Sequence, residues 1–229
     1  MANTTTGSHS DEHHEHPSFL QHHFDTPAQQ FDAAKLGMWL FLAQEVLFFS
    51  GLFVAYFVFR AWYPDAFAAG SRQLDTFWGT ANTGVLLFSS LTAALAVRSA
   101  QLGQKNRTSV FLIITVLCAC TFMVVKYFEY AHKFHLGLLP GKYFNPQHLH
   151  DGVVLPAETG IFFGLYFIMT GVHGLHVLIG IGVIIWILIR NIRGEFSERY
   201  FTPVDITALY WHLVDLVWIY LFPLLYLME

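Results

Sequence analysis

Charged residues are scarce in this sequence: Asp, Glu, Lys and Arg make up 12% of its 229 residues, whereas soluble domains average about 25%. Hydrophobic residues make up 55% and aromatic residues 17%. This composition is not that of an ordinary soluble domain and indicates an integral membrane protein. The net charge is only -4 and there is no block of basic residues, which argues against nucleic acid as a partner.

Cysteine is nearly absent as well. Only Cys118 and Cys120 occur, both inside an apolar run, so we expect buried thiols rather than a disulfide framework or a thiolate metal centre. Residues 1–34 contain no apolar run of the kind found in a secretory signal peptide, so we expect no such peptide.

Long apolar runs dominate the rest of the chain. The run Ile161–Ile189 contains no Asp, Glu, Lys or Arg, and as a helix it would exceed the ~30 Å thickness of a bilayer core. We therefore predict an all-α integral membrane protein, a bundle of five transmembrane helices over about 36–59, 77–100, 109–130, 160–189 and 204–228. Residues 1–34 are predicted as a polar, His-rich tail, residues 35–229 as the membrane domain and residues 62–76 as a short loop.

Basic residues predict the orientation of the bundle, because cytoplasmic loops carry an excess of Lys and Arg. With the N-terminus inside, the inner side holds Lys35, Arg98, Lys105, Arg107, Arg190, Arg193 and Arg199, and the outer side holds Arg60, Arg72, Lys133 and Lys142. We expect a cytoplasmic N-terminus and a periplasmic C-terminus.

The fourth span has two distinct faces on a helical wheel. One face carries Gly160, Gly164, Gly171 and Gly174, which predicts close packing against another helix. His173 and His176 lie on the opposite face and need polar partners.

Several titratable residues fall inside the predicted spans: Glu45, His173, His176, His212 and Asp215. Ionisable groups at such depth are costly and are functional by default. From the residues alone three interpretations stay open: a proton relay, a metal site, or a hydrogen-bonded network that fixes the packing.

A second polar group is expected near the outer surface and comprises Lys126, Glu129, Tyr130 and Glu158. Lys126 and Glu129 are i,i+3 neighbours on a helix and can form an ion pair.

The tail carries its own histidines: His9, His13, His14, His16, His22 and His23. They are consistent with a simple solvated tail, with a proton-collecting surface, because imidazole exchanges protons near neutral pH, or with adventitious metal binding.

Specific motifs occur in order along the chain: GMWLFLAQEVLFFSGLFVAYF, ANTGVLLFSS, KYFEY, FFGLYFIMTGVHGLHVLIG and LYWHLVDLVWIYLFPLLYL. Together they resemble the third subunit of haem–copper terminal oxidases, in particular bacterial cytochrome c oxidase subunit III. The resemblance covers all five spans.

The resemblance implies an accessory subunit without haem, copper or other metal of its own, in the bacterial cytoplasmic membrane. Its partners would be subunit II, structural phospholipid and the catalytic subunit I, which holds the haem and copper. The resemblance is also compatible with membership in a larger respiratory supercomplex. The subunit would support proton uptake, and Glu45 matches the family's buried, carbodiimide-reactive carboxylate. A quinol oxidase subunit III and a stand-alone membrane metalloenzyme remain the alternatives.

Two departures from the family pattern stand out. The longer family form has two further N-terminal helices that form one wall of a lipid cleft, whereas this sequence begins at the helix equivalent to the third. Lys126 occupies a position where the family often has an uncharged Gln.

Overall fold

The computed structural model describes residues 20–145 and 155–227. Within them, five helical segments are long and apolar enough to cross a membrane, which confirms the predicted all-α membrane class. They are built on α1 (Pro27–Trp62), α3 (Thr76–Gln101), α4 (Lys105–His135), α5 (Thr159–Arg193) and α6 (Thr202–Phe222). The shorter elements are α2 (Pro64–Ser71), the 3-10 turn η1 (Gly141–Tyr143) and the π-helical turn η3 (Pro223–Leu227), which continues α6.

Local sequence signals explain where the long helices begin and end. Thr26 accepts a hydrogen bond from the Gln29 amide at 3.2 Å and Pro27 follows it, a capped start that places α1 earlier than expected. The first two turns of α1 therefore belong to the segment predicted as tail. Asp75 caps α3 in the same way. Gly194, with a φ of 82°, ends α5 in the left-handed conformation that glycine adopts most readily.

The segment predicted as a short loop contains the helix α2, which is a correction. Its Phe67 is buried between the rings of Tyr56 and Phe162, at centroid distances of 5.1 and 5.4 Å. Gly70 lies against Phe162 so closely that an added Cβ would be 2.3 Å from that ring. Pro64 and Gly70 suggested a loop, but Pro is well placed in the first turn of a helix and tertiary packing stabilises the remainder.

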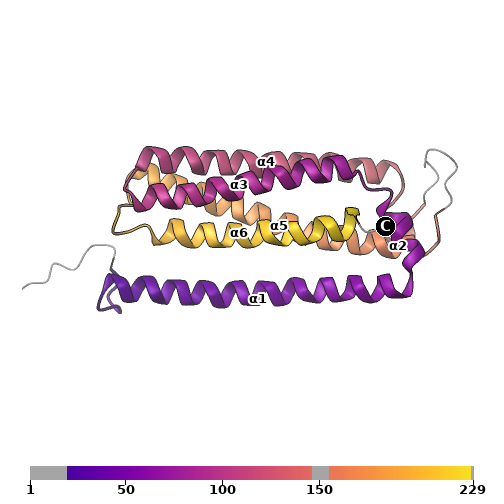
Figure 1. Cartoon of the computed structure of the whole chain (residues 1–229), viewed down its shortest axis with the longest axis horizontal. Coiled ribbons are helices and arrows are strands. Elements are labelled where there is room, and N and C mark those ends of the chain that lie inside the picture. The colour runs from indigo at the N-terminus through magenta and orange to yellow at the C-terminus, as the bar shows by residue number, and fades with distance from the viewer. Residues whose placement is uncertain (1–19, 146–154, 228–229) are drawn as a thin grey trace, which may run out of the picture.

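Figure 1 shows the arrangement: α3 and α4 form a long hairpin, α5 and α6 pack against it, and α1 runs along the other side of α6. α6 is the most buried span and α1 the least. The start of α1 (indigo) and the C-terminus lie at opposite ends of the bundle (Figure 1), as five spans require. Which end faces the cytoplasm stays a prediction.

Polar contacts attach α1 to α6 near both of its ends. At one end Lys35 forms a salt bridge of 3.3 Å with Asp205. Towards the other end the buried Tyr56 hydroxyl donates to the Leu224 carbonyl at 2.6 Å. Leu224 lies in the π-helical turn η3. In such a turn the backbone hydrogen bonds are shifted by one residue relative to an α-helix.

The closest glycine contact in α5 differs from the predicted one. An added Cβ at Gly180 would lie 2.8 Å from the ring of Trp211 on α6, a distance that requires glycine. At the four predicted packing glycines an added Cβ would come no closer than 3.4 Å to any neighbour; these are Gly160, Gly164, Gly171 and Gly174. Their face is therefore not the close helix crossing that the four glycines predicted.

We predict that Gly180→Ala lowers the stability of the protein by about 1–3 kcal/mol, because the methyl group would overpack a closed site. Trp211 is fully buried and its indole N–H donates to Ser89 at 2.9 Å, so the ring cannot move freely. Thermal unfolding of the purified protein measures the effect. Gly182→Ala is the matched control, since nothing lies within 4 Å of its added Cβ; equal effects of the two substitutions would contradict the prediction.

Candidate functional site

A buried ion pair lies on α4, where Lys126 and Glu129 are one helical turn apart. Their charged atoms, Nζ and Oε2, are 3.0 Å apart, and the two side chains are 9% and 7% exposed. This confirms the predicted pair. Charges so deeply buried require further hydrogen bonds, because attraction between the two alone does not offset the loss of water.

Two tyrosines from other elements supply those hydrogen bonds. Tyr166 of α5 donates to Glu129 Oε1 at 2.8 Å, and Tyr226 of η3 donates to the same oxygen. Lys126 Nζ in turn donates to the Tyr166 and Tyr226 hydroxyls at 3.2 and 2.9 Å. The three N–H groups of the ammonium therefore all have acceptors. This closed cluster joins α4, α5 and η3.

An aromatic cage surrounds the ammonium. Its nitrogen lies 5.1–5.5 Å from the ring centroids of Tyr130, Tyr166, Trp218 and Tyr226, within the range of cation–π attraction. The predicted outer-side residue Tyr130 contacts the cluster in this way, and its hydroxyl bonds to Thr170. Glu158 is exposed at the start of α5 and makes no capping bond there, so the structure does not place it in the cluster.

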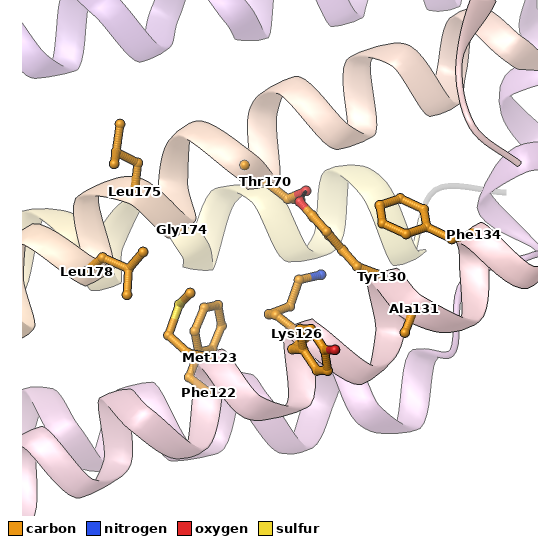
Figure 2. A pocket seen from close by; sticks show the side chains of 12 residues that line it. Phe122, Met123, Lys126, Tyr130, Ala131, Phe134, Thr170, Gly174, Leu175 and Leu178 are labelled. Atoms are coloured by element: carbon orange, nitrogen blue, oxygen red, sulfur yellow. Dashed lines mark hydrogen bonds between the residues drawn. The ribbon is translucent and has the colours of Figure 1, made fainter. Parts of the chain in front are cut away.

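Beside the ammonium a pocket of about 520 Å³ opens between α4 and α5. In Figure 2, Lys126, Tyr130 and Thr170 lie on one side of this pocket and Leu175 and Leu178 on the other. Gly171 and Gly174 also line it, and added Cβ atoms there would have no neighbour closer than 3.9 Å. These two glycines of the predicted packing face thus border an open pocket.

A second polar site joins α1 to α5. His176 Nε2 lies 3.1 Å from Glu45 Oε2, and His176 Nδ1 lies 2.8 Å from the Val172 carbonyl oxygen. Phe49 packs against the imidazole with a centroid distance of 5.2 Å. Each residue lies at the midpoint of its helix, so the pair lies midway along the length of both helices.

Hydrogen-bond chemistry restricts the protonation of this pair. A carbonyl oxygen only accepts, so His176 Nδ1 must carry a proton. The contact between Nε2 and the Glu45 oxygen then requires a second proton, on either the imidazole or the carboxyl group. The contact is then a hydrogen bond either from a protonated Nε2 to the carboxylate or from a carboxylic acid to Nε2.

The other residues of the predicted buried network do not join this pair. Both ring nitrogens of His173 are buried without a hydrogen-bond partner, and its ring packs on Phe122 and Trp218. His212 Nδ1 bonds to the Ser90 hydroxyl at 2.7 Å rather than to Asp215. Ser90 also lies close to Asp215, whose two carboxyl oxygens are buried.

The five residues thus do not form one network: of the possible bonds among them, only that between Glu45 and His176 is present. The sequence grouped these residues only by their depth within the predicted spans. Depth does not determine the direction in which each side chain points across the bundle.

Known proteins share this sequence pattern. The profile of the family described as cytochrome c oxidase subunit III matches residues 153–229. A protein of Bacillus subtilis named quinol oxidase subunit 3 is 32% identical over 199 residues, covering 84% of this chain and 86% of the relative. This chain belongs to the cytochrome c oxidase subunit III family.

Other relatives carry the cytochrome c oxidase name. A probable cytochrome c oxidase subunit 3 of Nocardia farcinica is 30% identical over 191 residues, which cover 83% of this chain and 86% of the relative. The cytochrome c oxidase subunit 3 of Loxodonta africana is 29% identical over 222 residues, 91% of this chain and 74% of the relative. Proteins named as subunits of cytochrome c oxidases and of quinol oxidases are therefore both among the relatives of this subunit III chain.

The predicted proton-collecting histidines of this subunit III are only partly visible. His22 and His23 are exposed, with ring centroids 5.2 Å apart, whereas His9, His13, His14 and His16 lie outside the described residues. Within residues 20–145 and 155–227, no three His, Cys, Asp or Glu side chains gather as a metal site would require. The predicted absence of a metal in this chain stays a prediction.

Sequence reasoning missed two residues of the buried cluster, Tyr166 and Tyr226. They lie 40 and 100 residues from Lys126, so no local spacing links them to it. The available signal was the charge of Lys126 itself. A buried ammonium must find acceptors, and a tyrosine in a neighbouring span is a suitable one.

We predict that Lys126→Gln and Glu129→Gln each destabilise this subunit by about 3–5 kcal/mol, because each leaves one buried charge without its partner. The double variant should recover most of the loss, since two amides can still hydrogen-bond to the tyrosines. A double-mutant cycle on thermal unfolding of the oxidase complex measures the coupling. Additive losses in the double variant would show that the two charges do not depend on each other.

Proposed function

We propose that this chain is an accessory subunit of a proton-pumping oxidase, with no redox centre of its own, that packs against the catalytic subunit and supports its proton uptake. Membership in the subunit III family supports the association with other oxidase subunits. The observation that carries the proton-uptake role is the Glu45–His176 pair, whose Nε2 and Oε2 atoms lie 3.1 Å apart at the midpoints of two membrane-spanning helices.

The pair is suited to exchanging a proton rather than storing a charge. Its proton can reside on the imidazole or on the carboxyl group without a change in net charge, so moving it between them avoids an isolated charge in the bundle. Glu45 lies on α1, the least buried span in the isolated chain. A partner packed against α1 would therefore lie next to the pair.

The excess of Lys and Arg on one side supports a cytoplasmic N-terminus. In that orientation the tail histidines lie on the side from which an oxidase of this kind takes up protons. Bacterial relatives from Bacillus and Nocardia support a bacterial cytoplasmic membrane. We propose this location, with subunits I and II as the immediate partners and structural phospholipid as a further one.

Cytochrome c is the proposed electron donor of the complex, and quinol is the second candidate because the Bacillus relative is named a quinol oxidase subunit. Other subunits bind the electron donor, so the identity of the chains that co-purify with this one would indicate which donor the complex uses. A companion with a copper–thiolate centre would indicate cytochrome c.

We predict that Glu45→Gln, combined with removal of residues 2–24, causes a severalfold faster loss of activity during sustained turnover, most strongly at high pH where protons are scarce. The amide cannot carry the shared proton, and the truncation removes the tail histidines. Oxygen consumption over many turnovers, recorded across a pH series, measures the effect. Glu158→Gln is the control because that carboxylate is exposed and outside both sites; unchanged turnover and inactivation in the double variant would refute the proton-uptake role.

We also predict that the purified chain co-purifies with haem- and copper-bearing subunits and contains no metal itself once separated from them. Affinity purification followed by metal analysis of the separated chains tests this. A stoichiometric metal in the isolated chain would instead support the stand-alone metalloenzyme.

A further inference from the structure

The hydrogen bond between Glu45 and His176 joins two helices that each contact α6 more than they contact each other. Among the described residues it is the only hydrogen bond between α1 and α5. A hydrogen bond weakens within a few tenths of an ångström of added distance, so the spacing of the two helices must be held closely. Since α6 packs against both, the contacts of α6 set that spacing.

Tyr210 of α6 contacts both helices. Its side chain is buried, and its hydroxyl donates to the His176 carbonyl oxygen at 3.0 Å. Its ring centroid also lies 6.1 Å from that of Phe41 on α1. Phe41 is four residues before Glu45 and therefore lies one turn earlier on the same face of α1. The Tyr210 side chain thus connects the backbone of one member of the pair to the helix that carries the other.

A glycine leaves the room that the tyrosine ring occupies. Gly180 lies one turn after His176 on α5, and a Cβ added there would be 3.3 Å from Cε1 of Tyr210. A larger side chain at this position would press on the ring that carries the hydroxyl. Because glycine has none, the ring lies against α5 and its hydroxyl reaches the His176 carbonyl.

The His176 carbonyl can accept this bond in addition to its helical one. A carbonyl oxygen has two lone pairs, and within a helix one of them serves the amide four residues on. Among the described residues, the bond from Tyr210 is the only hydrogen bond between α5 and α6. It acts at the same residue whose imidazole meets Glu45.

Tyr210 is a neighbour of the pair but does not hold its proton. Glu45 is close enough to act on Tyr210 electrostatically, yet the Tyr210 hydroxyl donates to the backbone carbonyl rather than to the carboxyl group. The carboxyl oxygen Oε2 keeps its contact with the imidazole. A role for Tyr210 would therefore be exerted through the geometry of the pair.

We propose that Tyr210 is a positioning residue for the Glu45–His176 pair. Its hydroxyl holds the α5 backbone at His176, and its ring holds α1 one turn from Glu45. Val172 and Phe49 orient the imidazole, whereas Tyr210 fixes the distance between the helices that carry the pair. The consequence for proton uptake rests on the proposed function, but the effect on the hydrogen bond does not.

The test is Tyr210→Phe in the purified protein, reconstituted in lipid bilayers with nitrogen-15-labelled histidine. Solid-state NMR of His176 Nε2, assigned by the signal that is lost in His176→Gln, reports the hydrogen bond of this nitrogen. We expect the signal to shift in Tyr210→Phe. Exchange of the bridging proton with deuterated buffer should become roughly fivefold faster, which is the factor for one ordinary hydrogen bond. The substitution keeps the ring that packs on Phe41.

Tyr56→Phe is the matched control. Tyr56 is also buried, and its hydroxyl also donates to a backbone carbonyl of another element, that of Leu224 at 2.6 Å. It lies about three turns after Glu45 on α1. Both substitutions remove the same group, so both should lower the thermal stability of the protein to a similar degree. Only Tyr210→Phe should change the His176 signal.

An unchanged His176 signal and exchange rate in Tyr210→Phe would overturn the proposal. Equal changes in the two tyrosine variants would overturn it as well, because they would show a general loosening of α1. Oxygen consumption during sustained turnover of the Tyr210→Phe oxidase tests the proposed function separately. A changed signal with normal turnover and inactivation would support the positioning role and count against the role of the pair in proton uptake.

Discussion

The cost of placing an ammonium group inside a membrane protein governs the architecture around Lys126. An unpaired charge in such surroundings is prohibitive, and here the cost is offset by a carboxylate one turn away, two tyrosine hydroxyls and an aromatic cage. Because these groups come from α4, α5 and η3, the same charge holds three elements in register. The π-helical turn at the end of α6 brings Tyr226 into this cluster.

The two buried polar sites differ in what their hydrogen bonds allow. Around Lys126 every donor of the ammonium is used, and the two charges compensate each other, so the site is saturated. The Glu45–His176 pair has one proton that two atoms can hold, with a carbonyl fixing the other ring nitrogen. A saturated cluster stabilises a fold, whereas a shared proton can be exchanged. This contrast is why the proposed proton role rests on Glu45 and not on the stronger ion pair.

Exposed apolar side chains mark the surfaces of the isolated chain that partner proteins or lipid would cover. α6 is surrounded within the chain, whereas α1 contacts it mainly through a few residues such as Tyr56 and leaves most of its surface uncovered. In a family whose members are oxidase subunits, this is the expected form of a chain that completes its packing in a complex. The hairpin of α3 and α4 presents a different surface, because Arg98 and Arg107 lie exposed near the turn that joins the two helices and neither forms a salt bridge within the described residues.

Sequence alone determined the membrane class, the approximate spans and the Lys126–Glu129 pair, because hydropathy and i,i+3 spacing act over short distances along one helix. It also indicated Glu45 and His176 as residues in need of partners, but not that they partner each other. Which side chains meet across the bundle was decided by the rotation and crossing of the helices. Those depend on contacts such as Gly180 against Trp211, between residues from different helices. No local pattern encodes them, so the partition of polar residues into a saturated cluster, a proton-sharing pair and the unpaired His173 emerged only in the tertiary structure.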